Sequence, residues 1–282
     1  MPNTVYSLNC RGKLVTIAQP VVMGILNVTP DSFFEGSRQH SLDHVLATAA
    51  RMLQEGAMIL DIGGQSTRPG AADIGAAEET DRVVPAIEAI AAHFPDALIS
   101  VDTFRAPVAR AAVQAGAHIV NDVSGGSLDA DMLTTVGELQ VPYICMHMRG
   151  TPATMQHLTQ YDNMVTDVID FFVERTDACR KAGIKDVIID PGFGFAKTPV
   201  QNFQLLRELQ SFQIFGRPVL LGVSRKSTIC KTLNITADEA LNGTTVLNTI
   251  GLLNGASILR VHDVKEAVEA VKLVVAVNAA HS

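Results

Sequence analysis

Eight short apolar runs recur along the chain, separated by longer stretches with helical periodicity. They cover residues 21–26, 58–62, 98–101, 118–120, 142–146, 187–189, 218–223 and 257–261. The runs are almost continuously hydrophobic rather than alternating, which is typical of parallel strands buried on both faces. The pattern therefore predicts eight parallel strands with helices between them.

Helical periodicity fills the stretches between these runs. Over residues 42–53, apolar side chains recur on one helical face. Ser41 is a suitable N-cap for this helix and Gly56 a suitable stop, because glycine adopts the left-handed conformation that often ends helices. Pro85 lies inside a second helical pattern, residues 83–94. Since proline lacks an amide donor, we expect a kink there or two shorter helices.

The order of the elements indicates the fold class. Strict alternation of strand and helix with right-handed crossovers predicts an α/β protein with a (β/α)8 TIM barrel, and an open doubly wound sheet is the alternative. The 282 residues fit one barrel. We therefore expect a single domain over residues 1–282, in which residues 1–20 form an N-terminal extension packed on the barrel.

Charge and cysteine spacing exclude several classes of protein. The 22 basic and 29 acidic residues give a formal charge of −7, which argues against a general nucleic-acid binder because phosphate backbones would be repelled. Every apolar run is interrupted before the roughly 18 residues that a membrane span needs. The four cysteines stand far apart, with no CxxC pair and no secretory leader. We expect a cytoplasmic protein without disulfides.

Polar residues follow the apolar runs at their carboxyl ends. They are Asn27, Asp61, Asp102, Asn121, Asp122, His147, Asp190, Arg225, Lys226, Arg260 and His262. In a barrel, the carboxyl ends of all the strands surround one mouth, where ligands bind. For a single side chain, the alternative is that a strand end simply meets solvent. Several such residues beside apolar neighbours need partners, which favours a binding site.

The residue types at this mouth indicate two kinds of ligand group. Asp102, Asn121 and Asp190 can together satisfy the N–H groups of a planar heterocycle with an amidine-like edge, such as a guanine or a pterin. The same mouth has cations for an anion such as a phosphate. These are Arg68, Arg225, Lys226, Arg260 and His262.

Seven segments, in one order along the chain, resemble dihydropteroate synthase of the folate pathway. They read GILNVTPDSF (24–33), DIGGQSTRPGA (61–71), SVDT (100–103), NDVSGG (121–126), DPGFGFAK (190–197), GVSRKS (222–227) and RVHD (260–263). The resemblance implies a (β/α)8 barrel that condenses 6-hydroxymethyl-7,8-dihydropterin diphosphate with p-aminobenzoate to 7,8-dihydropteroate and diphosphate. It also implies a Mg²⁺ requirement, a homodimer and a sulfonamide target.

The resemblance assigns roles to residues that match the family motifs. For the pterin it implies Asp102, Asn121, Met146, Asp190 and Lys226. For the diphosphate it implies Asn27, Thr67, Arg260 and His262, with Asn27 also the Mg²⁺ ligand. For the aminobenzoate it implies Phe33, Thr67, Arg68, Pro69, Phe195, Lys226 and Ser227. The residues expected to act in catalysis are Asp102, Asp190, Lys226, Arg260 and His262.

The chain departs from the family pattern at two places, and two rival functions compete with that of a synthase. The chain has SFFEGS where the family has SFSDGG, which places Phe34 beside the aminobenzoate side, and it has Thr228 where phenylalanine is usual. Both departures put sulfonamide affinity in doubt. The rivals are a pterin-binding methyltransferase and a pterin-binding protein without turnover. Against the methyltransferase, the STRP, SRKS and RVH segments provide for a diphosphate and a carboxylate that it has no need to hold. A binding protein without turnover would be expected to lack some of Asn27, Thr67, Lys226 or Arg260, and all are present.

Overall fold

The computed structural model describes residues 4–28, 38–65 and 74–280, and the side chains of 38–41 lie outside the description. In chain order the elements are β1 (Tyr6–Cys10), β2 (Lys13–Ile17), β3 (Val21–Asn27), α1 (Arg38–Glu55), β4 (Ile59–Gly63), α2 (Gly75–His93), β5 (Leu98–Asp102), α3 (Ala106–Ala115), β6 (Ile119–Asp122), α4 (Met132–Leu139), β7 (Tyr143–Met146), η2 (Met155–His157), α5 (Met164–Lys181), β8 (Val187–Asp190), α6 (Pro199–Arg207), η3 (Leu209–Phe215), β9 (Leu220–Leu221), α7 (Ser227–Leu233), α8 (Leu241–Leu253), β10 (Ile258–Val261) and α9 (Val264–Ala279).

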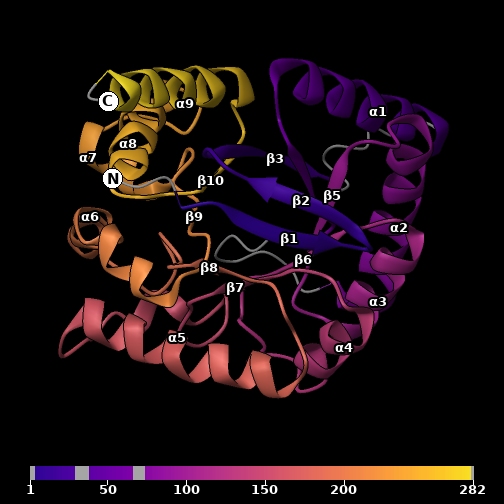
Figure 1. Cartoon of the computed structure of the whole chain (residues 1–282), viewed down its shortest axis with the longest axis horizontal. Coiled ribbons are helices and arrows are strands. Elements are labelled where there is room, and N and C mark those ends of the chain that lie inside the picture. The colour runs from indigo at the N-terminus through magenta and orange to yellow at the C-terminus, as the bar shows by residue number, and fades with distance from the viewer. Residues whose placement is uncertain (1–3, 29–37, 66–73, 281–282) are drawn as a thin grey trace.

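Eight parallel strands form a closed barrel with helices outside it (Figure 1). The strand order is β8-β7-β6-β5-β4-β3-β10-β9. A parallel bridge between Ile189 and Val219 joins the two end strands. The predicted TIM barrel is therefore confirmed, and the open doubly wound sheet is wrong. The predicted seventh strand, residues 218–223, is longer than β9, because only Leu220 and Leu221 keep regular strand pairing there.

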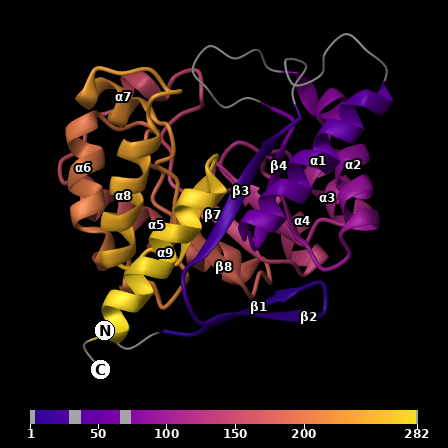
Figure 2. The same ribbon diagram turned by 90° about the horizontal axis from the view of Figure 1, so that it is seen from above.

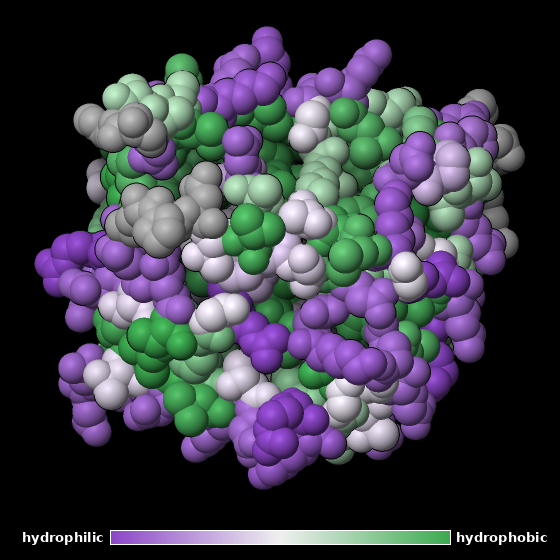
Figure 3. All heavy atoms as spheres, in the orientation of Figure 1, coloured by the Kyte–Doolittle hydropathy of each residue, from purple (hydrophilic) through white to green (hydrophobic). Residues whose placement is uncertain are grey.

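The amino end of the barrel is filled with apolar side chains and covered by the β1–β2 hairpin. One inward-facing residue from each strand joins this layer: Met23, Ile59, Leu98, Ile119, Ile144, Ile188, Leu220 and Ile258. The hairpin adds Leu8, Cys10, Val15 and Ile17 to the same cluster. Figure 2 shows the hairpin lying across this end, and Figure 3 shows side chains covering the middle of the same face.

The pleat of the strands places polar side chains directly above this apolar layer. Alternate residues of a strand point the same way, so the residue two positions after an inward one also points inward. Ile59 is followed in this way by Asp61, and Ile258 by Arg260. The intervening residues face the helices, where Leu60 and Leu259 belong to the outer core. The carboxyl half of the barrel interior is therefore polar.

Two helix predictions need correction. Helix α1 begins at Arg38, so Ser41 lies inside it rather than at its N-cap, whereas Gly56, with a φ of 103°, follows its last residue as predicted. Helix α2 runs without a break through Pro85, so two shorter helices are wrong. The proline removes one backbone hydrogen bond, but Val83 and neighbouring apolar side chains of α2 are buried against the core and hold the helix together.

Candidate active site at the carboxyl end of the barrel

One guanidinium group links two buried carboxylates at the centre of the mouth. Arg260 on β10 donates from Nε to Oδ2 of Asp61 and from Nη2 to Oδ2 of Asp102, each at 2.6 Å. Asn121 on β6 donates from Nδ2 to the same oxygen of Asp61 at 3.0 Å. Since 199 residues separate Asp61 from Arg260, only closure of the barrel brings these side chains together.

The cluster carries more negative than positive charge. Two carboxylates share one guanidinium, and both are buried. Burial raises the pKa of Asp102 to about 7; the adjacent Arg260 opposes this rise, and the carboxylates of Asp61 and Glu79 add to it. Burial alone would lower the pKa of Arg260, but Asp61 and Asp102 raise it, so the guanidinium stays charged. A ligand that donates N–H groups to Asp102 would offset the surplus charge.

Asp190 and Lys226 form the second part of the mouth. Oδ1 of Asp190 accepts a hydrogen bond from the amide of Gly192 at 2.8 Å. Burial raises the pKa of Asp190, and the Lys226 ammonium counteracts the rise. Burial likewise lowers the pKa of Lys226 to about 8, against the attraction of Asp190. Nζ of Lys226 donates to the carbonyl of Phe193 and lies 4.7 Å from the centre of the Phe195 ring.

An ion pair fixes the loop after β9. Arg225 donates from Nη2 and Nε to the two carboxylate oxygens of Asp263, at 2.6 Å and 3.0 Å. Its backbone is left-handed, with a φ of 55°. Arg225 was expected among the cations for an anion, but its charge is held by Asp263 at the start of α9. Its neighbour Ser224 has its Oγ 3.0 Å from Nδ1 of His262.

Asn27 stands at the tip of β3 and is exposed. Its Oδ1 and Oδ2 of Asp102 both lie near Gly63, 3.6 Å and 3.7 Å from the position that a Cβ would take there. The amide of Asn27 and the carboxylate of Asp102 are therefore neighbours across Gly63. Among the described residues, no three histidine, cysteine, aspartate or glutamate side chains gather into a metal site.

Comparison with known proteins agrees with this geometry. The sequence pattern of the pterin binding enzyme family matches residues 23–262. The chain is 44% identical to dihydropteroate synthase of Escherichia coli K12 over 269 residues, which is 95% of each chain. The Yersinia pestis synthase, solved with a sulfonamide drug complex, superimposes with a TM-score of 0.91 at 43% identity over 97% of this chain and 100% of that one. The Xanthomonas albilineans synthase, solved with 4-aminobenzoic acid, gives 0.91 at 41% identity over 98% and 99%.

The chain belongs to the dihydropteroate synthase family. The resemblance carried by the seven segments is therefore confirmed. Of the described part of the chain, no helix has both the length and the apolar character needed to cross a membrane.

The structure gathers most residues that the family motifs single out. Asp102, Asn121, Asp190, Lys226, Arg260 and His262 all lie at the carboxyl end of the barrel or in the loops directly after it. Met146 is buried in a small apolar cluster against which Phe195 packs. Ser227 is exposed at the start of α7. Phe33, Phe34, Thr67, Arg68 and Pro69 lie outside the described residues.

Sequence reasoning missed two charged residues of this family site. Asp61 was noted at a strand end but given no role, although it is the acceptor shared by Arg260 and Asn121. Its place two residues after Ile59 on one strand face would have indicated it. Lys197 was passed over completely. It is buried, at 7% exposure, and its signal was only that it ends the DPGFGFAK segment.

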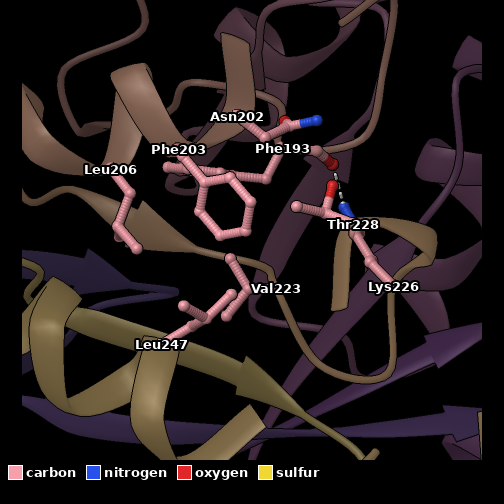
Figure 4. A pocket seen from close by; sticks show the side chains of 8 residues that line it. All are labelled: Phe193, Asn202, Phe203, Leu206, Val223, Lys226, Thr228 and Leu247. Carbon is pink, nitrogen blue, oxygen red and sulfur yellow. Dashed lines mark hydrogen bonds between the residues drawn. The ribbon is translucent and has the colours of Figure 1, made fainter. Parts of the chain in front are cut away.

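A narrow apolar cavity of about 10 Å³ lies behind Lys226 (Figure 4). Its walls come from the β8–α6 loop, α6, the loop after β9, α7 and α8, and are Phe193, Asn202, Phe203, Leu206, Val223, Lys226, Thr228 and Leu247. At this size it holds about one water molecule. Thr228, where the family usually has phenylalanine, forms part of its wall.

Proposed function

We propose that the protein is a dihydropteroate synthase that joins 6-hydroxymethyl-7,8-dihydropterin diphosphate to p-aminobenzoate, with release of diphosphate. The observation that carries the proposal is the cluster of Asp61, Asp102, Asn121 and Arg260 at one mouth with Asp190 and Lys226. Acid acceptors and cations there meet the needs of a single ligand with an N–H-rich ring and an anionic tail. The names of the relatives support the same reaction.

The pterin ring takes the acidic side of the mouth. Its amidine-like edge donates to carboxylates of Asp102 and Asp190, and Asn121 supplies an amide that both donates and accepts. Asp102 and Asn121 are already tied through Arg260 and Asp61, so their positions are fixed before the ligand arrives. Met146 lines the ring from β7, and Lys226 approaches it from the loop after β9.

The diphosphate takes the basic side of the same mouth. Arg260 donates to the acids through Nε and Nη2, which leaves Nη1 for an anion. His262, two residues further along the same strand direction, and Thr67 from the loop after β4 complete the anion pocket. Arg260 thereby links the two halves of the ligand: it orients the acids for the ring and offsets charge on the departing group.

A Mg²⁺ ion fits at Asn27 beside the diphosphate. Mg²⁺ keeps several waters and is usually held by one or two protein groups together with substrate phosphates, so a lone exposed amide oxygen near Asp102 is a sufficient protein contribution. When bound there, Mg²⁺ would offset the negative charge of the diphosphate.

The p-aminobenzoate takes the side of Phe195, Lys226 and Ser227. The Phe195 ring offers an apolar face beside the Lys226 ammonium, and Ser227 opens α7 with a free hydroxyl at the surface. Phe33, Thr67, Arg68 and Pro69, which the family motifs assign to the same substrate, lie outside the described residues. A sulfonamide, which has a similar aryl amine, would compete for the same place; the Yersinia pestis synthase was solved in complex with a sulfonamide drug.

The reaction proceeds by loss of diphosphate followed by attack of the amine. Cleavage of the bond between the methylene carbon and the diphosphate oxygen leaves a cation delocalised over the dihydropterin, which the anionic Asp102 and Asp190 stabilise. A few kcal/mol from such fixed charges is enough to matter, since each 1.36 kcal/mol changes the rate about tenfold. The arylamine nitrogen then bonds to the carbon and releases a proton to solvent.

The protein acts as a homodimer in the cytoplasm. Apolar residues remain exposed on adjacent faces of α8 and α9, namely Val246, Ile250, Leu253, Leu273 and Val277. Their spacing of three or four residues forms a continuous stripe on each helix, which a second copy would cover. Sedimentation at micromolar concentration tests this proposal, and a monomer would refute it.

The activity is tested by mixing protein, pterin diphosphate and p-aminobenzoate with and without Mg²⁺, and by following diphosphate and dihydropteroate together. We expect equal amounts of both products, and only with the metal. Product formed equally well after chelation would remove the role of Asn27. Pterin binding without any product would favour a methyltransferase or a binding protein.

A further inference from the structure

Two lysines contact the backbone of the loop that joins β8 to α6. The half-buried Lys226, from the loop after β9, donates to the carbonyl of Phe193. The buried Lys197 belongs to the β8–α6 loop itself and donates from Nζ to the carbonyls of Gly192 and Phe195, at 3.0 Å and 3.1 Å. Its third contact, at 2.9 Å, is Nδ1 of His147. An ammonium has three N–H donors, and all three find acceptors here.

Two glycines and an alanine give the loop its shape. Gly192, Gly194 and Ala196 all have left-handed φ angles, of 73°, 80° and 50°, which glycine adopts without steric cost and alanine only with strain. Gly192 also lies close to its neighbour: a Cβ there would lie 2.0 Å from the carbonyl oxygen of His147. Lys197 supplies contacts that hold this shape, since it joins two carbonyls of the loop to the side chain of His147, directly after β7.

The ammonium of Lys197 has a neutral partner. Burial, together with the nearby charges of Lys197 and Arg149, lowers the pKa of His147 to about 2, so the ring is neutral and its Nδ1 can accept. Burial lowers the pKa of Lys197 to about 7, while Asp190 favours its charged form. With three acceptors around it and a carboxylate near it, the buried amine is better placed as a donor than as a base.

Other contacts hold the remaining backbone of the same loop. The amide of Gly194 donates to Oδ1 of Asn202 at 2.8 Å, and the hydroxyl of Tyr161 donates to the carbonyl of Ala196 at 2.9 Å. The result is a rigid segment that presents the Phe193 carbonyl and the Phe195 ring to Lys226. Of the groups expected to bind the pterin, Asp102 and Asn121 come from other strands, whereas Asp190 at the end of β8 accepts from Gly192 of this loop and Lys226 donates to Phe193.

We infer that Lys197 is a positioning residue for the aminobenzoate half of the site: it clamps the β8–α6 loop so that Phe195 and Lys226 meet the arylamine substrate. The inference rests on the proposed synthase function and goes beyond it, because it assigns the positioning of one substrate's subsite to one buried amine. Because Asp102, Asn121 and Asp190 stay on their strands, loss of the amine should weaken the second substrate more than the first.

The test uses Lys197→Met, which keeps length and removes the donor, with Lys231→Met at an exposed position as the matched control. We expect the KM for p-aminobenzoate to rise at least about tenfold, because the loop that positions Phe195 and Lys226 loses a charge-assisted contact. Calorimetric affinity for a pterin ligand should fall by a smaller factor, and Lys231→Met, at an exposed position, should match wild type in both.

A second variant keeps the test valid if Lys197→Met does not fold. Tyr161→Phe removes the hydroxyl that donates to the carbonyl of Ala196 in the same loop. We expect a smaller rise in the aminobenzoate KM, with pterin affinity unchanged. Equal losses for both substrates, or an unchanged aminobenzoate KM in both variants, would overturn the inference. If wild-type protein forms no dihydropteroate at all, the proposed function fails instead.

Discussion

The two ends of the barrel are built from the same eight strands, yet they differ in almost every physical respect. At the amino end, inward side chains such as Ile59 and Ile258 are apolar and meet a hairpin that shares their core. Two residues further along the same strands, Asp61 and Arg260 form a buried ion pair. A step of two residues along each strand thus separates a layer that stabilises the fold from a layer that binds a ligand.

The polar layer costs the folded state free energy. Buried carboxylates and cations lose their hydration, and their mutual attraction often does no more than offset that loss. The pKa of Asp102 is raised and that of Lys226 lowered for this reason. The apolar layer has no such cost. The comparison suggests that changes at the amino end alter stability alone, whereas changes at the carboxyl end alter binding and catalysis first.

The largest effect is expected from Arg260→Met. Without the guanidinium, Asp61 and Asp102 remain buried and unpaired, so we expect activity to fall by at least about a thousandfold and the free energy of unfolding by about 3–5 kcal/mol. Steady-state assays and urea unfolding measure the two. The exposed Arg207→Met is the control and should change neither. Activity within tenfold of wild type would show that this pair is not part of the site.

The next largest effect should appear in stability alone. Leu8→Ala opens a cavity between the hairpin and the barrel core, and we expect it to lower the free energy of unfolding by about 2–4 kcal/mol. Leu14→Ala, on the same hairpin but 71% exposed, should have little effect. Both variants should keep wild-type kcat/KM below their melting temperatures. A tenfold fall in kcat/KM for Leu8→Ala would contradict the separation of the two ends.

A smaller effect follows from the pKa of Asp102. Because burial raises it to about 7, the carboxyl is protonated in part of the free protein below that pH and loses an acceptor for ligand N–H groups. Pterin affinity should therefore fall as pH drops from 8 to 6, by up to about tenfold per unit. Asp102→Asn should bind weakly with a flat pH profile. A pterin affinity that rises as the pH drops would contradict this role for the raised pKa of Asp102.

The smallest effect is expected behind the site. Thr228→Val keeps the shape of the side chain and replaces a buried hydroxyl in the wall of the apolar cavity, so we expect stabilisation of no more than about 1 kcal/mol. Thermal unfolding measures it, with Thr232→Val on the same helix as a comparison. A loss of stability would indicate that the hydroxyl has a partner, such as a water in the cavity.

Much of the fold was predictable because buried parallel strands leave continuous apolar runs. Asp102, Asn121 and Asp190 were predictable in the same way, since each ends such a run. The pairing of charges was not. No local feature of the sequence indicates that Arg225 forms an ion pair with Asp263, because this pairing depends on contacts between distant segments of the folded chain.

Lys197 shows a second limit of sequence reasoning. A lysine shortly before a helix usually faces water, and hydrophobic periodicity carries no information about carbonyl groups that a loop turns inward. Its three acceptors, from Gly192, Phe195 and His147, become visible only once the left-handed residues of the loop are placed.

The central claim is that the ligand ring binds at the polar end and nowhere else. Calorimetric titration of a dihydropterin against wild type, Asp190→Ala and Leu8→Ala tests it most directly. We predict that Asp190→Ala loses affinity by at least about a hundredfold, through loss of a charge-assisted hydrogen bond to the ring, while Leu8→Ala binds as wild type does. Unchanged affinity in Asp190→Ala would contradict the claim.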